Sequence, residues 1–247
     1  NTTYFQQPNA LSTVINRVVT NTPSQIFGTL GSNGHLVLVN QSGIAVGAGA
    51  LVDTAGFTAS TLRMSDADAL AGRLRFGDGS AGAGLSVQGS ILARSGDVVL
   101  LGSSVETGKD ALVQTPNGAT ILVAGSAVSI SERGLEGINF EVQAPTDAAV
   151  NLGTLKGDAV GIFAGTLKHS GAIQATRASL EGGKVVLKAS GDAVVEGSGR
   201  VDATSTKGQG GRIEVLGHRV AVTDKAVLDT SGATGGGTVL VGGDYQG

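Results

Sequence analysis

The sequence has no cysteine and no tryptophan, and it is poor in proline, other aromatic residues and charge. Its 247 residues include four Pro, six Phe and two Tyr, and charged residues make up 15%. Without cysteine the chain has no disulfide, no thiolate metal ligand and no cysteine nucleophile. So few prolines exclude a collagen-like chain. A hydrophobic fraction of 40% combined with few charges also excludes a disordered chain.

The basic residues are too few and too scattered to form a stripe that binds nucleic acid. The chain has 17 Lys and Arg against 20 Asp and Glu, so we expect no nucleic-acid partner. Apolar runs stay well short of the roughly 18 residues of a membrane-spanning helix, and we expect no membrane insertion. The polar start at Asn1 shows no signal segment. A chain that is not exported, or a mature or excised fragment, would begin in this way.

Glycine is the residue in excess, with 41 copies. Between the glycines lie short β-prone segments such as His35–Asn40 and Arg212–Leu216. The alternation in the second segment places Ile213 and Val215 on one face. Because large aromatic side chains are scarce, the core has to be built from small aliphatic residues, with glycine where the chain turns. This composition indicates an elongated, β-rich molecule.

Related segments recur at a regular spacing. One motif begins at Gly171, Gly199 and Lys225, a second begins at Gly182, Gly210 and Gly235, and an earlier pair begins at Gly96 and Gly118. Periods of roughly 20–30 residues with short strands and glycine-rich corners are typical of a β-solenoid. We therefore predict an all-β fold, a right-handed parallel β-helix in a single elongated domain, with the handedness taken from the crossover preference of parallel strands.

Motifs that would carry catalysis or a cofactor are weak. His35, His169 and His218 are far apart in the sequence and show no metal-ligand spacing, so we interpret them as solvent-facing strand or corner residues. Glycine-rich matches are expected by chance at this glycine content. We expect no cofactor, no metal and no catalytic residue.

A carbohydrate-active enzyme, a polysaccharide lyase or glycosidase, is the alternative to a non-enzymatic solenoid, because such enzymes also use β-helices. They need clustered carboxylates beside a basic residue. The densest such patch contains Arg63, Asp66, Asp68, Arg73, Arg75 and Asp78. The competing interpretation is a solvated turn around a short helix over Ser65–Gly72, with Ser65 as its N-cap. Few aromatic residues are available to stack on sugar rings, which argues against an enzyme.

One stretch near the N-terminus carries a dense series of motifs. Within Val14–Leu62 the series reads Asn16-Arg17-Val18, Pro23-Ser24, Ile26, Gly28, Leu30, Asn33-Gly34, Asn40, Gly43-Ile44, Gly47 and Ala59-Ser60-Thr61. This series resembles the N-terminal two-partner secretion domain of the filamentous haemagglutinin family of large exoproteins, also called the haemagglutination activity domain. The resemblance continues to about residue 130, including Asn117-Gly118. Two departures stand out: Asn40-Gln41-Ser42-Gly43 replaces the family's Asn-Pro-Asn-Gly turn, and the N-terminal capping strands are expected to be missing.

The resemblance implies a division of the chain. Residues 1–132 would form the secretion-type β-helix module, and residues 169–247 would continue it as β-helix repeats. Residues 133–168, which contain Pro145 and fewer alternations, would be an irregular coil or a projecting loop or hairpin.

The resemblance also implies a function and partners. The family's domain directs export through a cognate outer-membrane transporter, whose periplasmic domains recognise it, and the rod then folds at the cell surface. The exported adhesin would be non-enzymatic and would present a surface to a host-cell or matrix receptor. The candidate secretion-motif and turn residues are Asn16, Arg17, Pro23, Ser24, Asn33, Gly34, Asn40, Gly43, Ile44, Asn117 and Gly118. The competing interpretation of these residues is ordinary β-helix corners, and another structural or toxin-delivery solenoid is the remaining alternative for the whole chain.

Overall fold

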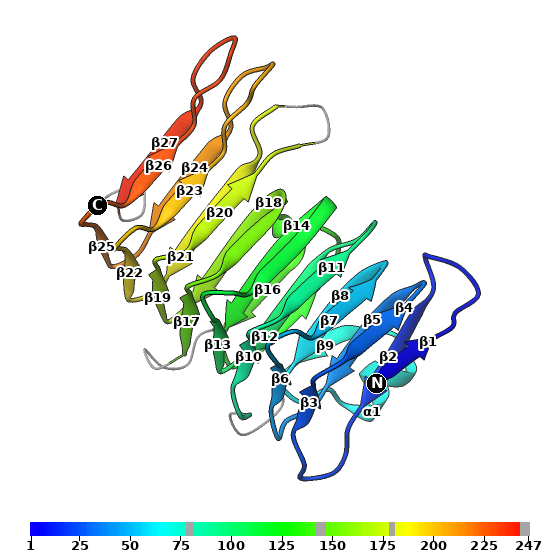
Figure 1. Cartoon of the computed structure of the whole chain (residues 1–247). Helices are drawn as coiled ribbons and strands as arrows, with labels where there is room; N and C mark the ends of the chain where they lie inside the picture. The colour runs from blue at the N-terminus through cyan, green and yellow to red at the C-terminus, as the bar shows by residue number, and fades with distance from the viewer. Residues whose placement is uncertain (78–81, 142–146, 178–180, 243–247) are drawn as a thin grey trace.

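The described coils run through three parallel faces and stack into a rod (Figure 1). The computed structural model describes residues 1–77, 82–141, 147–177 and 181–242. Face 1 contains β1 (Thr2–Phe5), β4 (Thr29–Ser32), β7 (Leu51–Thr54), β11 (Ser90–Ala93), β20 (Ala172–Ala175), β23 (Arg200–Asp202) and β26 (Val227–Asp229). Face 2 contains β2 (Thr13–Arg17), β5 (His35–Val39), β8 (Gly56–Ser60), β12 (Val98–Gly102), β21 (Lys184–Ala189), β24 (Arg212–Leu216) and β27 (Thr238–Gly242). Two long strands, β14 (Leu112–Ala124) and β18 (Thr154–Ala164), run through the corner and belong to both faces.

Face 3 closes each coil. It contains β3 (Ser24–Ile26), β6 (Ile44–Val46), β10 (Leu85–Val87), β13 (Ser104–Thr107), β17 (Ala148–Asn151), β19 (Thr166–His169), β22 (Asp192–Val195) and β25 (Arg219–Val222). All pairings within the three faces are parallel. The predicted right-handed parallel β-helix in a single domain is confirmed.

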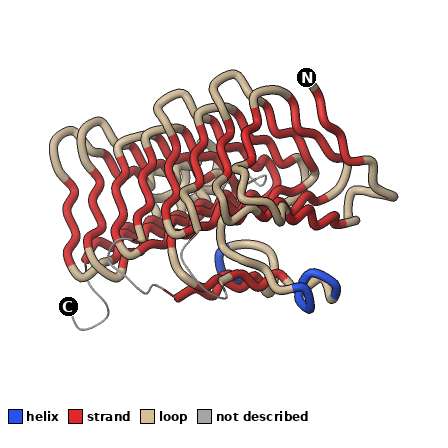
Figure 2. Tube along the Cα trace, turned by 90° about the horizontal axis from the view of Figure 1, so that it is seen from below, coloured by secondary structure: helices blue, strands red, loops and turns tan. Residues whose placement is uncertain are grey.

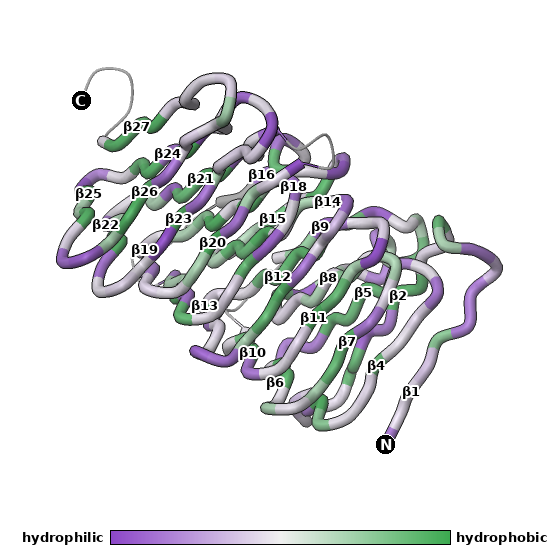
Figure 3. Tube along the Cα trace, turned by 45° about the horizontal axis from the view of Figure 1, so that its top comes forward, coloured by the Kyte–Doolittle hydropathy of each residue, from purple (hydrophilic) through white to green (hydrophobic). Residues whose placement is uncertain are grey.

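The register explains why the repeats were visible in the sequence. One interior column of face 2 runs through Val14, Leu36, Phe57, Val98, Thr120, Val160, Val185, Ile213 and Val239. The predicted repeat segments pair directly, as in Ile173 with Val201 and Val185 with Ile213. These columns form one continuous core that consists mainly of aliphatic side chains, and hydrophobic residues concentrate on the strands (Figure 3). Burying each such side chain contributes about 1.5–3 kcal/mol.

Two coils are about twice as long as their neighbours, because each carries an insertion after its face 2 strand. The first insertion forms α1 (Asp66–Leu70) and β9 (Leu74–Phe76), and the second forms β15 (Ala127–Ile130), a 3₁₀ turn (Leu135–Gly137) and β16 (Ile138–Glu141). Strand β15 pairs antiparallel with both β9 and β16. The resulting three-stranded sheet and α1 form a separate layer beside the rod (Figure 2).

This added layer covers the apolar outer surface of face 2. Side chains from the rod, such as Val37, Leu101 and Ile121, are buried together with Met64 and Val128 of the insertions. Ser65 caps α1 as predicted, because its hydroxyl accepts a hydrogen bond of 3.1 Å from the Asp68 amide. The layer is a second, smaller core outside the β-helix.

The strand boundaries differ from the predicted irregular segment at 133–168. The hairpin already begins at Ala127, and regular coil strands resume at Ala148, so that β17, β18 and β19 fall within the range. Pro145 lies outside the described residues. A short antiparallel hairpin alternates in the same way as a coil strand, and this is why the sequence did not locate the hairpin's start.

Candidate functional site

The candidate residues Pro23, Ser24, Asn40, Gly43 and Ile44 meet at one corner, between faces 2 and 3. The Asn40 side chain is fully buried. Its Nδ2 donates to the Thr22 carbonyl at 2.9 Å and to Ser24 Oγ at 2.8 Å. Its Oδ1 accepts a 2.9 Å hydrogen bond from the Ser42 amide. Asn40 thus closes its own turn and ties that turn to the preceding coil.

Gly43 completes this corner. Its φ of +116° is a conformation that L side chains rarely adopt. The Gly43 amide donates to Asn40 O at 3.1 Å, and its carbonyl accepts from the Ser24 amide at 2.9 Å. Gln41, which stands where the family has proline, accepts a 2.9 Å hydrogen bond from the Ala83 amide of the following coil. Asn40 and Gly43 therefore keep the turn's backbone requirements in the absence of proline.

A second corner, between faces 1 and 2, holds Asn33 and Gly34. The Asn33 side chain bonds both backbone groups of Gln7, accepting at 2.7 Å and donating at 2.8 Å. A Cβ at Gly34 would lie 2.6 Å from Ser12 O, so only glycine fits. The buried Gln7 amide donates to Ser32 Oγ at 2.7 Å and to His35 O at 3.0 Å. Gln7 is not among the residues predicted from the sequence, although the parallel pairing of β1 with β4 brings it beside this corner.

Asn117 and Gly118 occupy the same corner three coils further along, inside β14. A Cβ at Gly118 would lie 2.3 Å from the Gly96 carbonyl of the preceding coil. Asn117 is exposed and donates to Arg94 O at 3.2 Å. Gly118 is therefore required by the close contact between coils, whereas Asn117 contributes one surface hydrogen bond.

Asp97, a residue that the sequence did not single out, fastens the second insertion to this corner. Its carboxylate accepts hydrogen bonds from the Ala119 amide at 2.9 Å and the Gly134 amide at 2.8 Å. Arg133 lies 3.5 Å from the same carboxylate and donates to Asn117 O at 3.0 Å. A lone aspartate in the sequence carries no signal for such a role, because its hydrogen-bond donors are backbone amides.

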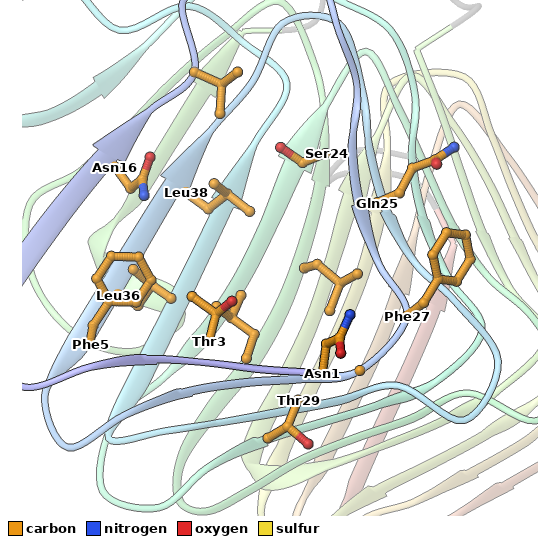
Figure 4. A pocket seen from close by; sticks show the side chains of 14 residues that line it. Asn1, Thr3, Phe5, Asn16, Ser24, Gln25, Phe27, Thr29, Leu36 and Leu38 are labelled. Carbon is orange, nitrogen blue, oxygen red and sulfur yellow. The ribbon is translucent and has the colours of Figure 1, made fainter.

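Asn16 and Arg17 lie next to each other in β2 but face different surroundings. Arg17 donates to Met64 O at 2.8 Å and pairs with Asp66, which holds the first insertion against the rod. Asn16 lines a hollow of about 510 Å³ at the N-terminal end of the β-helix (Figure 4). Apolar side chains including Phe5, Leu36 and Leu38 line it together with Ser24 and Gln25. The structure thus distributes the candidate residues over three turns, the N-terminal end of the rod and the contact with the first insertion rather than gathering them in a single site.

Both described aspartates of the charged patch considered for catalysis are ion-paired. Asp66 pairs with Arg17, and Asp68 accepts hydrogen bonds from Ser65 and Arg73. These two hydrogen bonds, first from Ser65 and then from Arg73, lower the pKa of Asp68. A glycosidase general acid needs a raised pKa, whereas the pKa of Asp68 is lowered. Asp78 lies outside the described residues.

The histidines do not form a metal site. Among the described residues no group of three or more His, Asp or Glu side chains could hold a metal ion. The interpretation of His169 as a solvent-facing residue is wrong, because its side chain is fully buried inside the β-helix. His35 is half-buried and His218 is exposed. In the described part of the chain, no helix has the length and apolar character needed to cross a membrane.

The parallel β-helix is also the fold of known secretion domains. The HMW1 secretion domain from Haemophilus influenzae superposes with a TM-score of 0.90 and 33% sequence identity, covering all of this chain and 67% of that one. The filamentous haemagglutinin secretion domain, at 15% identity, gives a TM-score of 0.57, covers 94% of this chain and 75% of that one, and shares the fold.

The model of the TPS secretion domain family matches residues 1–215. The chain therefore belongs to the TPS secretion domain family, a family of non-enzymatic domains of exported exoproteins. A curated relative, the heme/hemopexin-binding protein of Haemophilus influenzae, is 40% identical over 57 residues. That match covers 23% of this chain and 6% of the relative.

Proposed function

We propose that this chain is the secretion-directing part of an adhesin-type exoprotein and that it leaves the cell through a cognate outer-membrane transporter. The likeness to the HMW1 secretion domain over the full length of the chain carries this proposal. Recognition would involve the periplasmic domains of the transporter, and the exported rod would face a host-cell or matrix receptor at the cell surface.

The architecture suits stepwise folding during export. Within the three parallel faces, the described strands of each coil pair only with strands of the neighbouring coils, so a formed coil is a template for the next one. Without cysteine no disulfide can close a loop before the chain has passed the transporter. The Asn40–Gly43 corner contacts the coil before it and the coil after it, which makes it an early organiser of the stack.

The test is an export experiment with a signal peptide and a reporter fused to this chain. Cells that make the fusion with its transporter should release the reporter, and cells without the transporter should retain it in the periplasm. A matched fusion of residues 147–242, which lacks the N-terminal coils, should be retained in both strains. Release that does not depend on the transporter would contradict the proposed function.

A further inference from the structure

One interior column of the β-helix changes character along the rod. The last inward-facing position of each face 3 strand is stacked on the same position of the next coil, in the order Ile26, Val46, Val87, Thr107, Asn151, His169, Val195 and Val222. Five of these positions are aliphatic, and the three polar ones are consecutive and almost completely buried. Buried polar groups destabilise a fold unless they are hydrogen-bonded.

The three polar side chains form a hydrogen-bonded ladder. The Thr107 hydroxyl donates to Asn151 Oδ1, and Asn151 Nδ2 donates to His169 Nδ1 at 3.0 Å. On the other side of the ring, His169 Nε2 lies 3.3 Å from the Arg200 carbonyl. A carbonyl can only accept, so the Nε2 carries the hydrogen and Nδ1 is the acceptor. The ladder is therefore complete only while the imidazole is neutral.

A second proton on His169 would break this arrangement. An Nδ1–H would face the hydrogens of the Asn151 side-chain amide, so that two donors would meet, and the Asn151 backbone would offset this only in part. Turning the Asn151 amide over would restore an acceptor, but the cation would remain in the core. A buried charge without a partner is strongly unfavourable.

No carboxylate of the described residues is among the groups that shift the pKa of His169. On the strands packed around β19, Asp192 pairs with Arg219, and Asp202 pairs with Arg200, both on the outer surface. Three further ion pairs lie around these strands: Lys168 with Glu196, Arg200 with Asp229, and Lys184 with Glu136. Lys156 and Asp158 of β18 and Lys188 of β21 are also on strands next to β19. Burial of the ring lowers the pKa of His169 to about 4, although the backbone of Arg200 and then that of Asn151 act in the opposite direction.

The ladder also lies where register is hardest to keep. Thr107 and Asn151 are on adjacent coils, but the second insertion separates them in sequence. If this column were entirely aliphatic, a slip of β17 along it would exchange one small apolar side chain for another in the core and would cost little stability. With the ladder in place, the same slip would leave buried polar groups unpaired, at about 1–3 kcal/mol each.

We propose that Thr107, Asn151 and His169 form an acid-sensitive lock, which holds the coils around the second insertion in register while His169 is neutral and releases them when His169 is protonated. In the unfolded chain the histidine titrates near 6.5. Between about pH 6.5 and 4 the unfolded state therefore binds more protons than the folded state, and stability falls as the pH falls. The interval of about 2.5 pH units corresponds to a loss of about 300-fold in the folding equilibrium constant.

The experiment compares urea unfolding of the chain at pH values from 7.5 to 4.5 with that of two variants. In the first variant, Thr107→Val, Asn151→Val and His169→Val together restore the aliphatic column. The control, His218→Ala, removes an exposed histidine. As the pH falls, the wild type and the control should take up one more proton on unfolding than the triple variant, and their free energy of unfolding should fall more steeply. An identical pH dependence in all three proteins would overturn the proposal.

Two measurements on proteins with an intact ladder remain informative if the triple variant does not fold. With His35→Gln and His218→Ala combined, His169 is the sole histidine, and its NMR signals should not titrate above about pH 5. A midpoint near 6.5 in the folded state would overturn the proposal. Hydrogen exchange at pH 5 should show that β17 and β19 lose protection before β12 and β24. Simultaneous loss in all four strands would contradict a local lock.

Discussion

Replacing the buried Asn40 by valine removes the side chain that joins the first two coils at the corner of faces 2 and 3. Three hydrogen bonds disappear, and they leave the Thr22 carbonyl, Ser24 Oγ and the Ser42 amide without this partner. A hydrogen bond of this kind contributes about 1 kcal/mol net, and an unsatisfied buried group costs about 1–3 kcal/mol. Because Thr22 is exposed and Ser42 is half-buried, water can replace part of the loss. We expect Asn40→Val to destabilise the chain by about 3 kcal/mol.

The assay is urea unfolding followed by circular dichroism, with the midpoint and slope compared at constant pH. Asn117→Val is the matched control, because it applies the same substitution to an exposed corner asparagine with a single 3.2 Å hydrogen bond. The control should change the free energy of unfolding by less than about 0.5 kcal/mol. Equal effects of the two substitutions would refute the assignment of Asn40 as the structural link between coils.

The same variants connect the corner to export. With the cognate transporter present, Asn40→Val should reduce secretion of the reporter fusion, and Asn117→Val should leave it unchanged. Unchanged folding together with unchanged secretion of Asn40→Val would show that this turn has no role. Reduced secretion with unchanged stability would instead indicate that the transporter contacts the corner directly.

Two other substitutions test how the coils and the insertions are joined. Gly118→Ala should destabilise the chain by more than about 2 kcal/mol, because the new Cβ would lie 2.3 Å from the Gly96 carbonyl. The control Gly236→Ala adds a Cβ where no atom lies within 4 Å. Equal unfolding midpoints of the two variants would contradict the close contact at Gly118. Asp97→Ala should release the second insertion, so that proteolysis of the insertion and binding of a hydrophobic dye both increase. The control Asp53→Ala removes an exposed ion pair with Arg94 and should change neither proteolysis nor dye binding. Unchanged proteolysis and dye binding of Asp97→Ala would show that the apolar packing alone holds the insertion.

The features that the sequence predicted are those that repeat. Gly183 and Gly211 recur because a Cβ at either position would lie about 2 Å from a backbone atom of the preceding coil. Glycine spacing therefore reports coil length directly, and the alternation within Arg212–Leu216 reports which residues point inward. Both signals are local in the sequence, and both are produced again by each coil.

The insertions and the buried ladder lack such signals. Pairing of β9 with β15 joins segments that are separated by a complete coil, and β9 has three residues. Nothing in a segment so short specifies its partner. The Asp97 side chain accepts from backbone amides and the Gln7 side chain donates to the His35 carbonyl, and a sequence does not record which backbone group will lie nearby.

His169 shows why a residue's type is a poor guide to its burial in a solenoid. In a globular protein a histidine at the end of a short strand usually reaches solvent. In a β-helix successive residues of a strand point alternately to the interior and to the surface, so the register of the coil decides whether a histidine is buried. Leu167 points inward and is buried, and His169, two residues further, must point the same way. The alternation of β19 thus places the imidazole in the core, and the stacked Asn151 supplies the hydrogen bond that makes this placement tolerable.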